Sequence, residues 1–411
     1  MDTKRFKIAG LIAMALVLTV TLTACDSGGV PGETTPDEAT VESIGNLEDI
    51  TVSYGLEGSN VLEELRSKRG EVEVSLSDGS TATGKVAWDQ VPNNFDGTKE
   101  GEAFNFEGDV TYDGKVLGNK VFVAVTIAEK LEPTEEWVFD KYNENVFGVA
   151  VDSEDYVYSG DGGNNVRKIS SAGTEIWKNN NHNGWVYSVA VDEEGYVYSG
   201  STDNTVRKLS PTGKEIWKFD NHNDWVMSVA VDDDYVYSGS RDSTVRKIGS
   251  NDTEIWRFDE HTRRVYSVAV DQEGYVYSGS ADQTVRKISP GGRQIWEFDG
   301  HTNSVYGVAV DNEGYVYSAS RDGTVRKIGP EGEQEWKFEG HIDSVHNIAI
   351  GEDGYIYSGG VDGTVRKISP SGKEVWEFDN HSGTVYILDI DSEGKIYSGS
   401  WDDTVRKIKQ E

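Results

Sequence analysis

The sequence predicts an all-β protein: a seven-bladed β-propeller preceded by a small β-sandwich. The first observation is a unit of about forty residues that recurs seven times, a period typical of repeat architectures. The second is that each unit contains four short strand-like runs separated by turn residues, the pattern of a propeller blade. The third is one tryptophan at the same place in every unit, namely Trp137, Trp177, Trp217, Trp256, Trp296, Trp336 and Trp376.

Residues 1–24 have the features of an export signal. Lys4, Arg5 and Lys7 form a basic start, and residues 8–22 form an apolar stretch that is short for a membrane-spanning helix. The sequence LTAC at 22–25 then resembles the lipobox of bacterial lipoproteins. This resemblance implies that Cys25 becomes a lipid-modified N-terminus, which anchors an extracytoplasmic protein to the cell membrane at the cell surface. An uncleaved N-terminal anchor with an incidental cysteine is the alternative.

Residues 25–45 are rich in Gly, Pro, Thr, Ser and acidic residues without an apolar period, which predicts a flexible tether. Residues 46–130 instead show alternating runs such as EVEVSLS (71–77) and KVFVAVTI (120–127), with Asp-Gly pairs between such runs. We therefore expect a β-sandwich with Trp88 in its core. The stretch SLSDGSTATGKVAWDQ and the following DGTKEGEAFNFEGDV resemble a bacterial immunoglobulin-like domain of surface proteins, which implies a spacer or an adhesive module.

Residues 131–411 are expected to form the propeller. One unit contains the runs VYSVAVD (186–192), YVYSGS (196–201), TVRKL (205–209) and EIWKFD (215–220). The triplet VRK occurs seven times, once in each third strand, and the last unit ends after its third strand. The run from Glu135 to Asp140 precedes any complete blade. We therefore expect this N-terminal strand to become the fourth strand of the last blade, which closes the ring and removes open sheet edges.

The unit GHTNSVYGVAVDNEGYVYSASRDGTVRKI (300–328) resembles the WD-repeat family in its Gly-His opening, Ser-x-Ser strand and Asp-x-Thr-Val-Arg turn. The resemblance implies that a histidine, a serine and an aspartate hydrogen-bond within each blade. The pairs are His182 with Asp203, His222 with Asp242, His261 with Asp282, His301 with Asp322, His341 with Asp362 and His381 with Asp402, and the expected hydroxyl partners are Ser199, Ser238, Ser278, Ser318, Ser358 and Ser398.

The repeats also depart from that family. The first blade has Tyr142 and Gly163 where the histidine and aspartate belong, so its network is expected to be missing. The Trp-Asp dipeptide that ends the family's third strand is absent, so the networks lack their tryptophan. PTGKEIW (211–217) instead resembles the repeat of pyrroloquinoline-quinone-type propellers, which makes these blades WD-like units of hybrid sequence.

The residues that all blades share favour structure over chemistry. Six near-identical His/Asp pairs spread around a ring do not converge on one centre, and a buried histidine held by an aspartate fixes a loop. The only cysteine is Cys25, and no convergent ligand set is visible, so we expect no cofactor, no metal and no catalysis. Acidic turns such as DEE (192–194) leave calcium as an alternative to tight-turn formation. We expect these turns to pair with the Arg-Lys pairs of the third strands.

Candidate binding residues lie where the repeats differ, because loop tips are less constrained than scaffold positions. The loops after the histidines carry tryptophan and arginine, which are enriched at interfaces, and aromatic residues stand just inside the first strands. The alternative is that these side chains only pack between blades. The predicted binding residues are Trp185, Trp225, Arg263, Arg264, Trp401, Tyr187, Tyr266 and Tyr306.

These observations predict a non-catalytic, lipid-anchored cell-surface protein whose propeller is a binding or assembly scaffold for a protein or glycan partner. The formal net charge of −33 argues against nucleic acid as that partner, and we expect a monomer that meets the membrane only through the lipid on Cys25. One alternative is an envelope-assembly lipoprotein resembling that of the outer-membrane assembly machinery, although that resemblance implies eight blades and no spacer. A carbohydrate-active propeller enzyme is the other alternative, and it requires carboxylates converging at one mouth of the channel.

Overall fold

A computed structural model describes residues 133–410, apart from 143 and 233, and shorter stretches of the preceding chain. Those stretches are 41–44, 47, 50–52, 65–66, 71–76, 81–88, 91–92, 103–112 and 115–127. The predicted signal peptide, Cys25 and most of the predicted tether lie outside the described residues. The last part of the predicted tether, Val41–Ile44, forms a strand that pairs with Glu71–Leu76, so the folded region begins earlier than the predicted residue 46. In the part of the chain that the structure describes, no helix is long and apolar enough to cross a membrane.

The N-terminal strands are β1 (Val41–Ile44), β2 (Ile50–Val52), β3 (Glu71–Leu76), β4 (Thr81–Ala87), β5 (Ala103–Tyr112) and β6 (Lys115–Ile127). They form one sheet in the order β1-β3-β4-β5-β6-β2, antiparallel except between β2 and β6. The alternating pattern of β5 buries Phe104 and Phe106, and Trp88 is fully buried, as predicted. The described strands thus form one hydrogen-bonded sheet rather than the two sheets of a sandwich. The immunoglobulin-like assignment stays a prediction.

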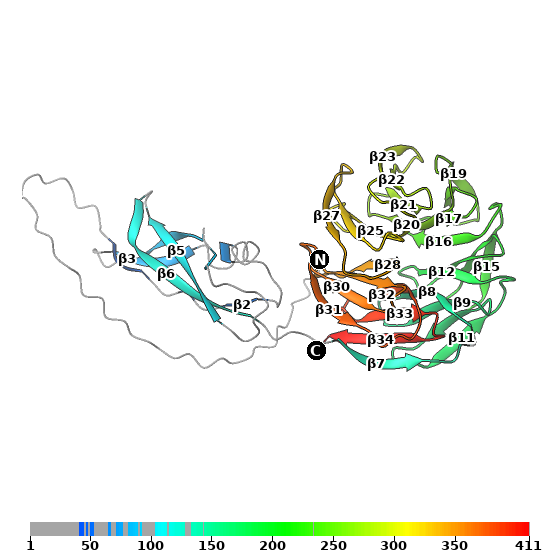
Figure 1. Cartoon of the computed structure of the whole chain (residues 1–411), viewed down its shortest axis with the longest axis horizontal. Helices are drawn as coiled ribbons and strands as arrows, with labels where there is room; N and C mark the ends of the chain where they lie inside the picture. Colours follow the sequence, from blue (N-terminus) through cyan, green and yellow to red (C-terminus); the bar gives the residue numbers. More distant parts are fainter. Residues whose placement is uncertain are drawn as a thin grey trace, which may run out of the picture.

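The remaining strands form seven antiparallel sheets of four strands each, which confirms the predicted seven-bladed propeller. Figure 1 shows the sheets arranged around a central axis, with the first strand of each blade innermost and the fourth outermost. The innermost strands are β8 (Val146–Val151), β12 (Val186–Val191), β16 (Val226–Val231), β20 (Val265–Val270), β24 (Val305–Val310), β28 (Val345–Ile350) and β32 (Val385–Ile390). They begin blades 1 to 7 in that order.

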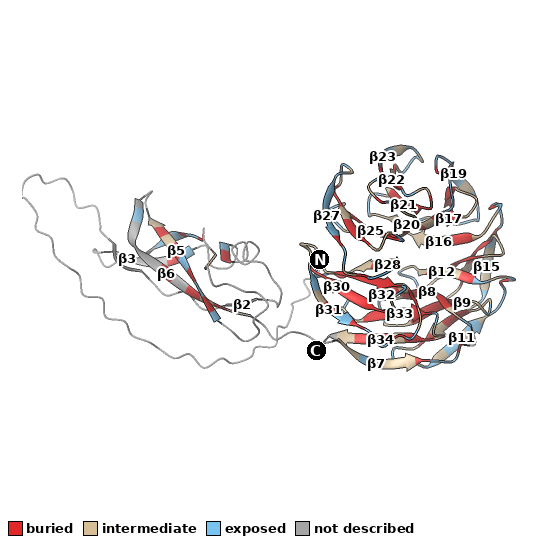
Figure 2. Ribbon diagram, viewed as in Figure 1, coloured by how far each residue is buried: buried red, intermediate tan, exposed pale blue. Residues whose placement is uncertain are grey.

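The middle strands are short and mostly buried, and Figure 2 shows burial concentrated inside the ring. The second strands are β9 (Val157–Asp161), β13 (Val197–Ser201), β17 (Val236–Ser240), β21 (Val276–Ser280), β25 (Val316–Ser320), β29 (Ile356–Gly360) and β33 (Ile396–Ser400). The third strands are β10 (Val166–Ile169), β14 (Val206–Leu209), β18 (Val245–Ile248), β22 (Val285–Ile288), β26 (Val325–Ile328), β30 (Val365–Ile368) and β34 (Val405–Gln410).

The outermost strands carry the tryptophan anchors. They are β11 (Glu175–Asn179), β15 (Glu215–Phe219), β19 (Glu254–Phe258), β23 (Gln294–Phe298), β27 (Gln334–Phe338), β31 (Glu374–Phe378) and, for blade 7, β7 (Pro133–Phe139). The ring therefore closes through the N-terminal strand, as predicted. β7 pairs with β34 from Phe139 opposite Val405 to Pro133 opposite Gln410, two residues further than the third and fourth strands pair in the other blades.

The core lies between neighbouring blades. Between blades 1 and 2, Tyr158 and Val166 of one blade pack with Val186 and Leu209 of the next. The tryptophans add to this packing as predicted: the Trp177 indole N–H donates to the Pro211 carbonyl of the next blade at 3.0 Å. The same packing of apolar side chains repeats around the ring, so each blade is stabilised by its two neighbours.

Candidate functional site

The predicted histidine networks are present, and His301 shows their geometry. Its Nδ1 lies 2.9 Å from Asp322 Oδ2, and its Nε2 lies 2.8 Å from the Ser318 hydroxyl. The backbone N–H of Thr302 and the hydroxyl of Thr324 also donate to the Asp322 carboxylate, at 3.0 and 2.6 Å. The same His–Asp and His–Ser contacts occur at His182, His222, His261, His341 and His381.

The ionisation of these groups supports a structural role. Burial lowers the pKa of His301, so the neutral imidazole donates from Nδ1 and accepts the Ser318 proton at Nε2. Burial alone would raise the pKa of Asp322, but hydrogen bonds from His301 and Thr324 outweigh it and hold that pKa below its ordinary value. Both carboxylate oxygens are therefore engaged in fixing the loop and turn, which leaves little capacity for catalysis.

An arginine of the third strand joins each network, two residues before the position of the tryptophan in the WD-repeat family. Arg207 on β14 donates from Nε to the Thr205 hydroxyl at 3.3 Å and forms an ion pair with Glu215 at 2.6 Å. It also lies 3.4 Å from Asp203. The predicted pairing of these arginines with the acidic turns between first and second strands was therefore wrong. The repeated VRK triplet is the signal that could have identified their role.

Blade 1 has a network of different composition. The Tyr142 hydroxyl donates to Ser159 at 2.5 Å and so takes the place of the histidine. The acidic member is Asp161 at the end of β9, which forms an ion pair with Arg167 at 3.2 Å. Blade 1 therefore lacks the His/Asp pair, as predicted, but a tyrosine–serine hydrogen bond and an aspartate–arginine ion pair stand in its place. The acidic residue lies two positions before Gly163, where the repeat pattern placed it.

In the acidic turns between first and second strands, the first aspartate binds groups of its own blade. Asp192 Oδ1 accepts the backbone N–H groups of Glu194 and Tyr196, while Oδ2 accepts the Tyr198 hydroxyl and lies 4.0 Å from the Lys208 ammonium. The predicted pairing of these turns with third-strand lysines is thus confirmed. Within the described residues, no group of three or more His, Cys, Asp or Glu side chains could hold a metal ion.

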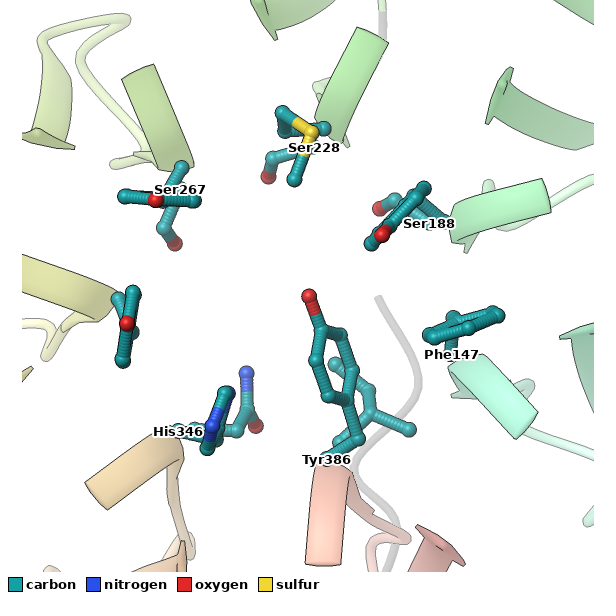
Figure 3. Close-up of a pocket in the computed structure, with 12 residues that line it drawn as sticks. Phe147, Ser188, Ser228, Ser267, His346 and Tyr386 are labelled. Atoms are coloured by element: carbon teal, nitrogen blue, oxygen red, sulfur yellow. The ribbon is translucent and has the colours of Figure 1, made fainter. Parts of the chain in front are cut away.

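The end of the ring that carries the histidine loops also carries the turns between second and third strands, and we call it the mouth face. Hydrogen bonds join the two sets, as from the Thr202 N–H to the Trp185 carbonyl at 2.9 Å. A hollow of about 400 Å³, open solvent included, lies among the innermost strands. In Figure 3, Tyr386 reaches from its strand toward the middle of the hollow, with Phe147 and His346 on either side. The lining residues are Phe147, Tyr187, Ser188, Met227, Ser228, Tyr266, Ser267, Tyr306, His346, Asn347, Tyr386 and Ile387.

Polar residues just below the mouth join the innermost strands. The Ser188 hydroxyl of β12 accepts the Val229 N–H of β16 at 3.1 Å, and the next two blade junctions repeat this contact. The side-chain amide oxygen of Asn347 on β28 accepts the Leu388 N–H in the same way. These side chains therefore stabilise the ring, and the aromatic residues above them are the part available to a ligand.

One half of the mouth face is aromatic. Trp185 stacks on Phe147 with ring centroids 5.6 Å apart, and Trp401 stacks on Tyr386 at 5.8 Å. Phe147 and Tyr386 meet edge to face at 5.3 Å, so a single cluster bridges blades 7, 1 and 2. Tyr187 and Trp225 extend the cluster to blade 3. Trp185 and Trp401 remain 45% and 44% exposed, which is unusual for tryptophans whose role is only packing.

The other half of the mouth face is basic. Arg263 and Arg264 are exposed on the histidine loop of blade 4, and Tyr266 meets Tyr306 edge to face at 4.8 Å. His346 stacks on Tyr306 at 4.6 Å, and burial lowers its pKa to about 4, so it is neutral. The structure thus divides the eight predicted binding residues between two adjoining halves of one face.

Two arginines of this half were missed by the sequence analysis. Arg241 and Arg321 occupy the same turn position as Trp401, in blades 3 and 5. The Arg241 guanidinium lies 4.5 Å from the Trp225 ring centroid, and Arg321 hydrogen-bonds to the Tyr306 hydroxyl. The variation at this turn position was the available signal.

Comparisons with known proteins agree with this geometry. The WD40 β-propeller domain of Doa1, known from a crystal structure, is similar to this chain with a TM-score of 0.63 and 25% identity, over 68% of this chain and 98% of that one. A search of curated proteins found no match. The family described as outer membrane protein assembly factor BamB matches residues 72–223, 162–280 and 281–393. Because these matches together span most of the chain, the protein belongs to this β-propeller family.

Proposed function

We propose that this protein is a non-catalytic scaffold of the cell envelope that holds a protein partner on its mouth face. The observation that carries the proposal is the aromatic cluster of Trp185, Phe147, Tyr386 and Trp401. Phe147 and Trp401 each occur at their position in one blade only, and the position of Trp185 holds tryptophan in blades 2 and 3 only, whereas six blades share the histidine network. Large exposed aromatic side chains on a rigid frame are typical energetic centres of protein interfaces.

The composition of the mouth supports binding rather than hydrolysis. A glycoside hydrolase needs two carboxylates flanking the bond that it cleaves. The residues that line the hollow include hydroxyls, aromatic rings and one imidazole, but no carboxylate. That imidazole, His346, stacks between Tyr306 and Tyr386, and its lowered pKa makes it a poor acid at neutral pH.

The family match favours a more specific second candidate, a role in outer-membrane protein assembly. The family's description names an assembly factor, and a scaffold that holds a partner is compatible with that work. The number of blades and the preceding sheet differ from what the resemblance to assembly lipoproteins implies. A deletion strain would test this candidate: lower levels of outer-membrane proteins support it, and unchanged levels with an intact scaffold interaction contradict it.

The experiment for the scaffold is affinity capture from envelope extracts of the source organism, with mass spectrometry of the captured proteins. The variant Trp185→Ala/Trp225→Ala/Trp401→Ala should lose the partner, because it removes the exposed rings of the cluster. The matched control is Ile176→Ser/Ile216→Ser/Ile255→Ser, which alters three side chains that are 50%, 51% and 52% exposed on outermost strands. Equal capture by the tryptophan variant, or equal loss by the control, would rule out the mouth face.

The proposed envelope location rests on Cys25 as the lipid carrier. Cells fed radioactive palmitate should label the protein, and Cys25→Ala should abolish the label and release the protein from the membrane fraction. A labelled Cys25→Ala variant would contradict this assignment.

A further inference from the structure

We infer that the partner presents an acidic peptide segment with a large apolar side chain, which binds across the two halves of the mouth face. This inference rests on the proposed function and names the chemistry of the partner. It comes from the distribution of arginine over the propeller. Because the chain carries a net charge of −33, a local excess of arginine on one face needs a specific reason.

The third-strand arginines already have acidic partners within their own blades. Arg207 and Arg246, for example, form ion pairs with Glu215 and Glu254 at 2.6 and 2.5 Å and lie beside the network aspartates. Six further arginines occur in the propeller, of which Arg257 and Arg293 lie away from the mouth face. The other four, Arg241, Arg263, Arg264 and Arg321, all lie on that face in blades 3, 4 and 5.

The guanidinium groups of these four arginines are available to bind a ligand. Arg241 stacks over Trp225, and Arg264 lies 5.9 Å from the Tyr266 ring centroid. A stacked guanidinium keeps the N–H groups at its edge free to bind a carboxylate in a bidentate manner. Within the described propeller, Arg263, Arg264 and Arg321 form no ion pair, and Arg241 has a partly exposed one with Asp224 at 3.6 Å.

The aromatic half adjoins the basic half through one residue. Trp225 contacts Arg241 on one side and the rings of Trp185 and Tyr187 on the other. A bound segment can therefore place carboxylates against the arginines and an apolar side chain on the cluster of Trp185 and Trp401. Charge complementarity selects an acidic peptide, whereas a neutral or basic segment would leave the arginines unpaired.

The direct test uses the full chain and a short labelled peptide in which glutamates flank a central phenylalanine, with a glutamine version as the comparison. Fluorescence anisotropy should show binding of the acidic peptide that weakens with salt, and at least about tenfold weaker binding of the glutamine peptide. The variant Arg241→Gln/Arg263→Gln/Arg264→Gln/Arg321→Gln should lose affinity for the acidic peptide by at least about tenfold.

The matched control changes net charge by the same amount elsewhere. Lys178→Gln/Lys218→Gln/Arg257→Gln/Lys337→Gln neutralises four exposed cations on outermost strands and should keep its affinity within about threefold. Equal binding of the two peptides, an equal loss in the control, or absence of binding would overturn the inference. Binding of a sulfated polysaccharide but not of the peptide at the same arginines would also overturn it, in favour of a glycan.

The envelope capture separates this inference from the proposed function. If the four-arginine variant still captures the partner while the tryptophan variant does not, the scaffold role stands and the acidic partner is excluded. If neither variant loses the partner, the mouth face itself is excluded.

Discussion

The Asp389 carboxylate on β32 accepts a hydrogen bond of 2.7 Å from the backbone N–H of Val151 on β8, a residue 238 positions away in the sequence. This contact lies at the junction where the last blade meets the first. Ile387 occupies the position of the serines that join other innermost strands, so it cannot accept a hydrogen bond there. Asp389 takes over that function two residues later, at a position where the other six blades have alanine.

Replacing Asp389 with asparagine should stabilise the protein at pH 7.5. Burial raises the Asp389 pKa from 3.8 to about 6, despite hydrogen bonds from Val151 and Ile390. Because this pKa is higher in the folded protein than in the unfolded chain, the free energy of unfolding falls as the pH rises from 3.8 through about 6. The loss is roughly 3 kcal/mol at most. An amide keeps the acceptor without ionising, as Asn347 does at the preceding junction. Thermal unfolding should show a higher Tm for Asp389→Asn at pH 7.5 and little difference at pH 4; a lower Tm at pH 7.5 would contradict the assignment.

Removal of one network carboxylate should destabilise the ring strongly. In Asp322→Ala, the His301 N–H and the Thr302 N–H lose their acceptor, which should reduce the free energy of unfolding by about 3 kcal/mol. The control Asp299→Ala removes an exposed carboxylate and should change stability by less than about 0.5 kcal/mol. Equal Tm values for the two variants would show that the network contributes little.

Two threonine-to-valine substitutions should have opposite signs. The Thr134 hydroxyl on β7 is buried without a hydrogen-bond partner among the described residues, so Thr134→Val should raise stability by about 1 kcal/mol. The Thr324 hydroxyl donates to Asp322 at 2.6 Å, so Thr324→Val should lower it by roughly 1–3 kcal/mol. Chemical denaturation of both variants under the same conditions checks the pair, and destabilisation of similar size in both would contradict it.

Three glycine-to-alanine substitutions should form a graded series. Gly213 has φ +79°, and an added Cβ would lie 2.8 Å from the Trp177 ring, so Gly213→Ala combines backbone strain with a clash. Gly394 has φ +80° with no atom within 4 Å of an added Cβ, so only the strain of about 1 kcal/mol applies. Gly291 has neither problem and should tolerate alanine. Differential scanning calorimetry should give the largest loss of Tm for the substitution at 213, a smaller loss at 394 and the smallest at 291. Any other order would contradict this packing of the turns.

Much of the fold could be predicted because the same sequence pattern occurs seven times. The strands and the closing strand follow from positions that every copy shares, and the His301–Asp322 pair follows from positions that six of the seven copies share. The mouth face was only partly predictable, because its geometry depends on which blades become neighbours when the ring closes. The ring centroids of Phe147 and Trp401 lie 6.5 Å apart although the two residues belong to the first and last blades. No local sequence pattern indicates that contact. Blade 1 shows the converse limit, because its acidic residue is Asp161, whereas the repeat pattern pointed to position 163.

The pairing of β7 with β34 also has a mechanical consequence. β7 is the first strand of the propeller in the chain and the strand that completes its last blade. Any pull transmitted along the preceding polypeptide while a partner holds the mouth face would therefore load the ladder between Pro133 and Phe139 first. That ladder extends to Gln410, further than its counterparts, and the additional pairs strengthen the ring at the place where tension enters.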